Sequence, residues 1–293
     1  MTSEVVKNPP TPGSSAWKRL ITASKVPIIL GISPHRSQFT LWHDMNGTIP
    51  DEGHVEGKPE WDWGHDAEPS LVKWWLRHNK GWQAGPGEIA YKDDDLPFPN
   101  MVTLDRRARR GRRFHVLECK TVRDMDTWGR PGEENSVPDH YRAQVITQMG
   151  ISGIHEASVI ALGFGTPEIH TVEWNPDLWD GIVAACADWH ASLEAGIAPD
   201  LDDSVSTYET VRGLHPDIDR ERLAPVDPKI AGAYLAATRI EKEAARIAQG
   251  RKTRLLAAMG NARRAVVDDD IIATRSPSGR GAVKLTPNLK AMK

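Results

Sequence analysis

The order of helical and strand-like patterns is the feature that most constrains the fold of this chain. Alternating apolar residues predict three short strands followed, after a helix, by two more. Apolar residues at helical spacing predict helices within 16–31 and over 37–47, 63–81, 138–153 and 175–196. Helices that alternate with groups of strands predict an α/β fold, in which helices flank a central mixed sheet.

The composition is that of a globular protein: 39% of the 293 residues are apolar, 26% are charged, and the formal net charge is −3. Two cysteines, Cys119 and Cys186, are too few for a disulfide framework or a four-cysteine zinc site, which favours a reducing, cytoplasmic setting. The chain shows neither a secretory signal at its start nor an apolar run near the roughly 20 residues that span a bilayer, so we expect no membrane partner.

Composition also predicts four segments along the chain. A polar, Pro-rich stretch over 1–15 predicts a disordered tail. The α/β domain is expected over 16–200, and a connector rich in Pro and Asp over 201–226. A long charged helix over 227–260 and a terminal β-hairpin form an extension over 227–293. Its plain role is packing against the core, and contact with another subunit or a partner is the alternative.

The segment RRFHVLECKT places an acid and a lysine two residues apart on a predicted strand. Alternate side chains of a strand share a face, so Glu118 and Lys120 point to the same side. Asp105 lies across a predicted hairpin from them. Two carboxylates on adjacent strands form a hard oxygen site suited to Mg²⁺, and a neighbouring lysine can orient a metal-bound water and offset phosphate charge. The pattern therefore suits phosphodiester hydrolysis.

Each of these features has an ordinary explanation when taken alone. A Glu-x-Lys pair is usually a solvated pair on a sheet surface. Tyr141, Gln144 and Gln148 share one helical face at i, i+3 and i+7, as surface residues often do. Glu68 is the kind of acid that the helix dipole favours in a first turn. The residues that accompany the Glu-x-Lys pair favour a metal site over a solvated surface pair.

Five motifs in order carry a resemblance to a known family: WKRLITASKV, WGHDAE, TLDRR, VLECKT and YRAQVITQM. Together they resemble the lambda-type exonucleases and YqaJ-like viral recombinases of the PD-(D/E)xK nuclease superfamily. The resemblance spans about residues 17–150, and the strand and helix pattern continues to about 196. It implies a restriction-endonuclease-like core with a central mixed β-sheet, to which the long C-terminal helix and hairpin are added.

The resemblance also implies roles for individual residues of the nuclease domain. Asp105 and Glu118 would be metal-binding acids, and Lys120 would be the catalytic lysine. Glu68 would be a further metal-binding acid, acting directly or through water. Gln144 would contact the metal-bound nucleophile or the lysine.

Near the N-terminus, Arg19 and Ser24 match the family's contacts to the terminal phosphate of DNA, although the spacing between them is shorter than in the lambda enzyme. Two departures lie elsewhere. Thr103-Leu104-Asp105-Arg106 stands where the family usually has Ser/Thr-Pro-Asp-Gly, which alters the turn. Pro69 directly after Glu68 restricts the backbone at that acid. His65 is an alternative or additional ligand.

A basic run, DRRARRGRR, joins the two strands that carry the acids. It is expected to be a loop with one of three roles: a solvated turn, a contact to an acidic partner, or a contact to DNA phosphates. Its position beside the site favours phosphate contact without base readout. The residues expected to bind DNA here are Tyr141, Arg106, Arg107, Arg109, Arg110 and Arg112.

The resemblance implies an exodeoxyribonuclease that depends on Mg²⁺, with Mn²⁺ as the alternative. It would digest the ends of linear double-stranded DNA in the 5′→3′ direction and leave 3′ single-stranded tails for a single-strand annealing protein. Family members form rings, so we expect a homo-oligomer. If a bacteriophage encodes the protein, we expect it in the cytoplasm of the bacterial host. The alternatives are a restriction or CRISPR-associated endonuclease and a catalytically decayed DNA-binding scaffold.

Overall fold

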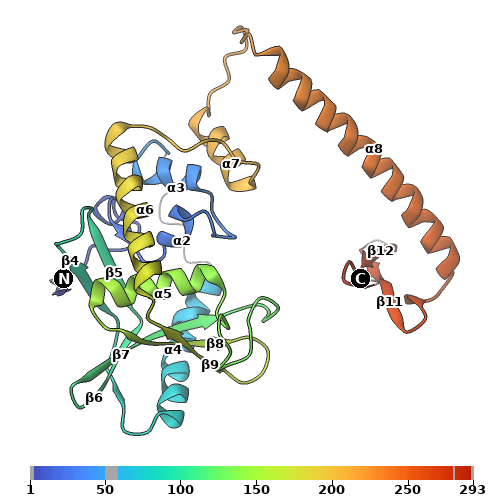
Figure 1. Ribbon diagram of the computed structural model, residues 1–293. Helices are drawn as coiled ribbons and strands as arrows, with labels where there is room; N and C mark the ends of the chain where they lie inside the picture. Colours follow the sequence, from blue (N-terminus) through green and yellow to red (C-terminus); the bar gives the residue numbers. More distant parts are fainter. Residues whose placement is uncertain (1–2, 50–58, 280, 292–293) are drawn as a thin grey trace. The chain divides into compact units, whose positions relative to one another are not determined.

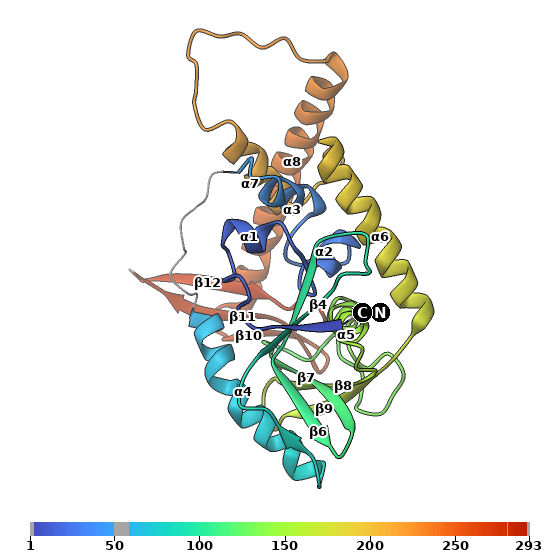
Figure 2. The same cartoon turned by 90° about the vertical axis from the view of Figure 1, so that its left-hand side faces the viewer.

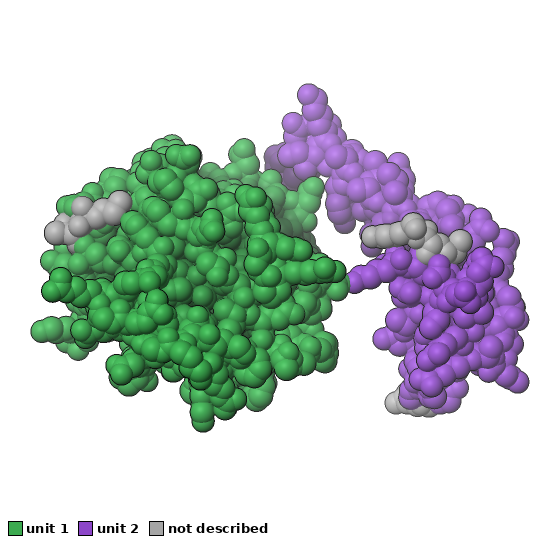
Figure 3. Space-filling view, turned by 60° about the horizontal axis from the view of Figure 1, so that its bottom comes forward, with its two compact units in different colours: residues 1–218 green, residues 219–293 purple. Residues whose placement is uncertain are grey.

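The computed structural model describes residues 3–49, 59–279 and 281–291. The chain divides into two compact units, Met1–Ile218 and Asp219–Lys293, which we call the N-terminal unit and the C-terminal unit (Figures 1 and 3). Among the described residues, no helix combines the length and the apolar character that crossing a membrane requires.

The N-terminal unit contains a mixed series of helices and strands. Its strands are β1 (Ser3–Val6), β2 (Ile21–Thr22), β3 (Gln83–Ala84), β4 (Ile89–Asp93), β5 (Asn100–Leu104), β6 (Arg106–Arg110), β7 (Arg113–Thr121), β8 (Glu156–Leu162) and β9 (Glu168–Glu173). Its helices are α1 (Ser15–Lys18), α2 (Val26–Ile29), α3 (Gln38–Met45), α4 (Pro59–His78), α5 (Asp139–Ser152), α6 (Pro176–Ala195) and α7 (Val205–Leu214).

Two sheets form the centre of this unit. The larger has the strand order β3-β6-β7-β8-β9, in which β7 and β8 run parallel and the other neighbours run antiparallel. The smaller has the order β1-β4-β5-β2, in which β2 and β5 run parallel. Helices α4 and α5 lie on opposite faces of the larger sheet (Figures 1 and 2). Their side chains belong to two separate clusters with residues of that sheet. This arrangement confirms the predicted α/β core with a mixed sheet flanked by helices.

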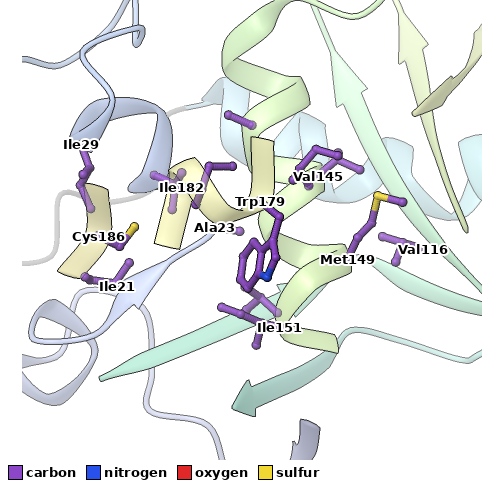
Figure 4. Close-up of a cluster of buried hydrophobic side chains, with 14 of the residues drawn as sticks. Ile21, Ala23, Ile29, Val116, Val145, Met149, Ile151, Trp179, Ile182 and Cys186 are labelled. Atoms are coloured by element: carbon purple, nitrogen blue, oxygen red, sulfur yellow. The ribbon is translucent and has the colours of Figure 1, made fainter. Parts of the chain in front are cut away.

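The main core lies where α5 and α6 pack together. Figure 4 shows Trp179 of α6 in the same buried cluster as Val145 and Met149 of α5. The helices approach closely at Gly150, where a Cβ atom would lie only 2.5 Å from Trp179 Cε3. Nine of the 14 residues of α5 are buried. This helix is therefore a rigid support for any side chain that it presents to the sheet.

Two segments of the N-terminal unit differ from the sequence predictions. Residues 3–6, expected within a disordered tail, form β1 and pair with β4. The basic segment 106–110, expected as a loop, is strand β6, because it pairs with β7 on one side and β3 on the other. Ala108, at its centre, is fully buried.

Helix α7 lies within the expected connector but packs on α3 of the N-terminal unit through hydroxyl groups. Thr207 Oγ1 donates a hydrogen bond of 2.7 Å to Ser37 Oγ. Thr40 Oγ1 lies 2.7 Å from both Ser206 Oγ and Thr210 Oγ1. These contacts place the change from one unit to the other after α7.

The C-terminal unit consists of a long helix and a small sheet. Helix α8 (Pro228–Met259) begins at Asp227, whose side chain accepts a hydrogen bond from the Lys229 N–H, and continues without a break through Gly250. Strands β10 (Arg264–Val267), β11 (Asp270–Ser278) and β12 (Ala282–Pro287) pair in that order, antiparallel throughout. The predicted hairpin thus gains a third strand. The core of the unit is small, with four buried residues: Met259, Ala265, Ala273 and Leu285.

Candidate active site

Strand β7 presents alternate side chains to the two helices that cover the sheet. Val116 belongs to the main core with α5, whereas Leu117 packs in a second cluster with α4. Glu118 and Lys120 follow Val116 on the α5 side, where both meet side chains of that helix. The shared face of Glu118 and Lys120, predicted from alternation, is confirmed.

Glu118 is a buried carboxylate, 2% exposed, with hydrogen-bond donors on both oxygens. Its Oε1 accepts a bond of 2.6 Å from Gln144 Nε2 and lies 2.5 Å from Lys120 Nζ. Its Oε2 accepts a bond of 2.7 Å from Gln148 Nε2. A charge this deep is tolerated only when it is paired and hydrogen-bonded. The side chain of Glu118 is therefore held in one orientation.

Asp105 lies in the bend between β5 and β6. The register of β6 on β7 pairs Arg106 with Leu117, which brings Asp105 beside Glu118. Asp105 Oδ2 accepts a bond of 2.7 Å from the Cys119 N–H. Burial raises the pKa of Asp105 well above its usual value, and the neighbouring Glu118 carboxylate raises it further. Two acids that disfavour each other's charge form a site that a cation would stabilise.

Lys120 is the cation of this cluster. Burial alone would lower its pKa, but the carboxylates of Glu118 and Asp105 outweigh that effect, so the pKa of Lys120 is raised. Its Nζ also lies 5.1 Å from the ring centroid of Tyr141. At neutral pH Lys120 is therefore an ammonium group, suited to stabilising an anionic oxygen rather than to accepting a proton.

A further acid, Glu68, comes from α4. Its Oε2 lies 3.3 Å from Arg106 Nη1, and its Oε1 lies 3.1 Å from His65 Nδ1. Ligand atoms of His65, Glu68 and Glu88 lie within 4.8 Å of one another, close enough to share a metal ion. Glu88 was not among the residues expected from the sequence. Glu68 thus has both a basic partner and two neighbouring metal-binding groups.

A single cleft of about 650 Å³ is lined by these groups except Glu88. It lies between α4, the end of β7 and the start of α5. Its polar lining includes carboxylate oxygens, which are the ligands that Mg²⁺ and Mn²⁺ prefer. The predicted site residues that line it are Glu68, Asp105, Glu118, Lys120 and Tyr141.

The arginines assigned to DNA contact are not brought together, because successive residues of strand β6 point to opposite faces. Arg106 is engaged with Glu68. Arg107 donates a bond of 2.6 Å to a tyrosine hydroxyl on β4, and Arg110 lies 5.0 Å from the centroid of an indole ring. Of the arginines assigned to DNA contact, three are exposed near the hairpin turn, at the opposite end of β7 from Lys120: Arg109, Arg110 and Arg112.

Arg19 and Ser24 flank the short strand β2, and both are exposed. Strand β2 runs parallel to β5, with Thr22 opposite Met101. Strand β5 leads to Asp105, but neither Arg19 nor Ser24 is among the residues that line the cleft.

A buried lysine that the sequence did not indicate shapes the turn containing Arg19. Lys25 is 2% exposed, and its Nζ donates hydrogen bonds to the carbonyl oxygens of Trp17 (3.1 Å), Lys18 (2.7 Å) and Leu20 (2.7 Å). Burial lowers the pKa of Lys25 to about 7. The three carbonyl groups oppose this change, because they match the three N–H groups of an ammonium.

Gln148 is the residue of the site that the sequence analysis left unassigned. It is 1% exposed, and its Nε2 donates to the Thr103 carbonyl at 3.1 Å as well as to Glu118. The signal was present, because Gln148 follows Gln144 by one helical turn between apolar residues. Two amides at this spacing can reach one buried acceptor group. Gln144 itself donates to Glu118.

Residues 15–155 match the model of the YqaJ-like viral recombinase domain. No curated protein matches the chain.

Solved structures of exonucleases are similar to the chain at low identity. An alkaline exonuclease, LHK-Exo, from Laribacter hongkongensis is 18% identical, with a TM-score of 0.46 over 63% of this chain and 93% of that chain. Its complex with dAMP is 16% identical, with a TM-score of 0.47 over 62% and 92%. A phage-related exonuclease from Haemophilus somnus 129PT is 12% identical, with a TM-score of 0.40 over 61% and 96%.

The matched residues run from α1 through α5 and include every acid of the cleft, Lys120 and both glutamines. Over residues 15–155, just under half of the chain, the sequence is similar to the YqaJ-like viral recombinase domain family.

Proposed function

We propose that this protein is a metal-dependent exodeoxyribonuclease that acts on the ends of linear double-stranded DNA. The observation that carries the proposal is the convergence of Asp105, Glu118 and Lys120 in one cleft. The match of residues 15–155 to the YqaJ-like viral recombinase domain supports a nuclease that works in recombination.

Asp105 and Glu118 would hold a divalent cation, with Glu68 as a further ligand. The pKa of Asp105 is raised first by burial and then by the Glu118 carboxylate, which fits this role because a bound cation would stabilise the charged form of Asp105. Mg²⁺ or Mn²⁺ is the proposed ion. When bound, such an ion lowers the pKa of a coordinated water and polarises the phosphate.

The side chains around the acids would prepare the site before DNA arrives. Gln144 and Gln148 hold both oxygens of Glu118, so its position costs no reorganisation during the reaction. Lys120, which stays protonated, would stabilise the negative charge that develops on the scissile phosphate. Its bond to Glu118 keeps the ammonium at the cleft.

End recognition is proposed for Arg19 and Ser24. They would contact a terminal 5′-phosphate, which gives 5′→3′ digestion and leaves a 3′ single-stranded tail. Strand β2, which lies between them in the sequence, pairs in parallel with β5, the strand that leads to Asp105, and this pairing supports the role. A single-strand annealing protein would receive the tail, and a homo-oligomeric ring would retain the duplex.

The test uses linear duplexes with 5′-phosphate or 5′-hydroxyl ends and closed circular DNA, each with Mg²⁺, Mn²⁺ or EDTA. We expect metal-dependent loss of linear DNA, faster from 5′-phosphate ends, with circles intact and Lys120→Ala inactive. Cutting of circles would replace the proposal with an endonuclease. If DNA is bound but stays intact with either metal, the enzyme assignment is wrong.

A further inference from the structure

The two units carry opposite charges. The C-terminal unit has 16 Lys and Arg against 8 Asp and Glu, a net charge of +8. The N-terminal unit has 21 against 32, a net charge of −11. The overall charge of −3 hides this division. A polyanion such as DNA is therefore repelled on average by the unit that carries the cleft and attracted by the unit that does not.

Four of the seven Lys and Arg residues of α8 lie on one side of the helix, together with Glu243, which pairs with Arg246. These four cations are exposed. They are Arg239, Lys242 and Arg246, at i, i+3 and i+7, and Arg254, two further turns along the helix. Ile230 and the buried Met259 belong to the opposite side. From the first to the last of the four arginines and lysines, the helix rises roughly 22 Å, comparable with six phosphates of one DNA strand.

The small sheet has one apolar and one cationic face. The register pairs Arg264 with Thr274 and Lys284 with Ser276. Because cross-strand partners share a face, these side chains lie on one side of the sheet. Both basic residues are exposed. The other side supplies Ala265, Ala273 and Leu285 to the core with Met259. The outer face thus combines cations with hydroxyl groups, which are the side chains that contact phosphate oxygens.

We propose that the C-terminal unit is a duplex-DNA-binding module that holds the phosphate backbone through α8 and the outer face of the sheet. Its residues are Arg239, Lys242, Arg246, Arg254, Arg264 and Lys284. This binding function does not require the N-terminal unit to be a nuclease.

The residue types favour duplex DNA over other anionic partners. Binding of single strands relies on aromatic side chains that stack on bases, and the C-terminal unit has one aromatic residue, Tyr234. Helices that lie in membrane surfaces carry bulky Trp, Phe and Leu on the apolar side. Helix α8 has nine alanines and neither Trp nor Phe, and the bulky apolar side chains that it exposes are Ile230, Leu235, Ile240 and Ile247. Exposed cations without stacking groups suit a backbone that is recognised without regard to sequence.

Such a module would supply affinity that the acidic unit lacks. The residues between α7 and α8, 215–227, form a short link, so DNA held by one unit stays at high local concentration for the other. The expected consequence is longer digestion per encounter, but binding itself is the property to test.

The test measures the affinity of the full chain for a fluorescent 30-base-pair duplex in EDTA, from about 50 to 200 mM salt, where binding falls steeply with salt. One variant carries Arg239→Gln, Lys242→Gln and Arg254→Gln, and a second carries Arg264→Gln and Lys284→Gln. The matched control carries Lys73→Gln, Arg77→Gln and Lys80→Gln, three exposed cations of the N-terminal unit. Circular dichroism checks that each variant is folded.

We expect the helix variant to lose about tenfold or more in affinity, and its salt slope to fall by roughly one for each phosphate contact removed. The sheet variant loses less, and the control keeps both the affinity and the slope of the natural chain. Unchanged affinity and slope in both variants would overturn the proposal, as would tighter binding to polyglutamate or anionic vesicles than to duplex.

A footprint on the natural chain covers the case in which a variant misfolds. Acetylation of Lys242 and Lys284 should be slowed by duplex, whereas Lys73 and Lys80 should react as before. Equal protection of all four lysines, or of none, would contradict the proposal. Because EDTA prevents metal-dependent cleavage, none of these results depends on whether the N-terminal unit is a nuclease.

Discussion

The two units of this chain differ in tryptophan content and in how much of each is buried. The N-terminal unit holds all 11 tryptophans and buries its key carboxylate, Glu118, beneath a helix that is itself mostly buried. The C-terminal unit has no tryptophan, and its core cluster has four buried residues. A reactive centre needs charges fixed where water is scarce, whereas capture of a phosphate backbone needs charges spread where water is plentiful.

Replacing Lys120 should give the largest effect and should separate chemistry from binding. Lys120→Met is expected to lower the cleavage rate by about 10²–10³-fold, the usual cost of losing one group that stabilises the developing charge. Metal-free duplex binding should hardly change, because we assign it to the C-terminal unit. Single-turnover rates and anisotropy measure the two properties.

The control for this prediction is Lys80→Met, an exposed lysine outside the cleft, which should leave both properties intact. A Lys120→Met protein with normal single-turnover rates would remove Lys120 from the reaction.

Gly150→Ala tests how tightly the N-terminal unit is packed. The added Cβ would collide with Trp179, so we expect the free energy of unfolding to fall by about 1–3 kcal/mol. Tryptophan fluorescence during urea unfolding reports this unit alone, because every tryptophan belongs to it. Gly181→Ala, which meets nothing within 4 Å, is the matched control. Equal midpoints for the two variants would mean that α5 and α6 pack more loosely than described.

Asp105→Asn should increase the stability of the metal-free protein while abolishing activity. Because the folded-state pKa of Asp105 is raised, its contribution to stability is present below the unfolded value near 4 and is lost as pH rises through the folded value. Asparagine cannot ionise, so the advantage of the variant should grow with pH.

Melting temperatures in EDTA from pH 4 to 8 measure this difference. Asp180→Asn, at an exposed position on α6, should follow the natural chain at every pH. Parallel curves for Asp105→Asn and the natural chain would show that the acid cluster carries no strain in the absence of metal.

The smallest effect is expected in the C-terminal unit. Gly250 lies inside α8 with nothing within 4 Å of an added Cβ, so Gly250→Ala should stabilise the helix by roughly 0.5–1 kcal/mol. Far-ultraviolet circular dichroism should record a later helical transition, while the tryptophan transition stays where it was. A shift in both signals would show that the two units unfold together.

Much of the site could be predicted because its signals are local. Alternation along β7 places Glu118 and Lys120 on one face, and helical spacing places Gln144 and Gln148 one turn apart. The hydrogen bonds of those amides could not be predicted, because they depend on how α5 lies across the sheet. The cluster of Glu88 with His65 and Glu68 was likewise hidden, since it joins separate elements of the unit.

The fold shows the same limit. The helices α5 and α8 are long and patterned, so the sequence predicts them well. Strand β6 is five residues with a single apolar side chain, and it is a strand only because β3 and β7 pair with its two edges. The opposite charges of the two units are visible in the sequence, but only after the boundary between the units is known.

The contrast between the two sides of the cleft predicts where variation would be tolerated. Glu118 accepts hydrogen bonds from two amides of α5, a helix with little exposed surface. A substitution of either amide therefore disturbs the packed interior as well as the position of the acid. His65, which lines the cleft, and Glu88, beside it, are exposed, and ligand atoms of both lie within 4.8 Å of a Glu68 oxygen; we call this position the rim. A mutant library selected for altered metal preference should therefore collect substitutions at the rim and leave the floor of the cleft unchanged. Substitutions at the rim are therefore the ones through which the metal preference of this site can change.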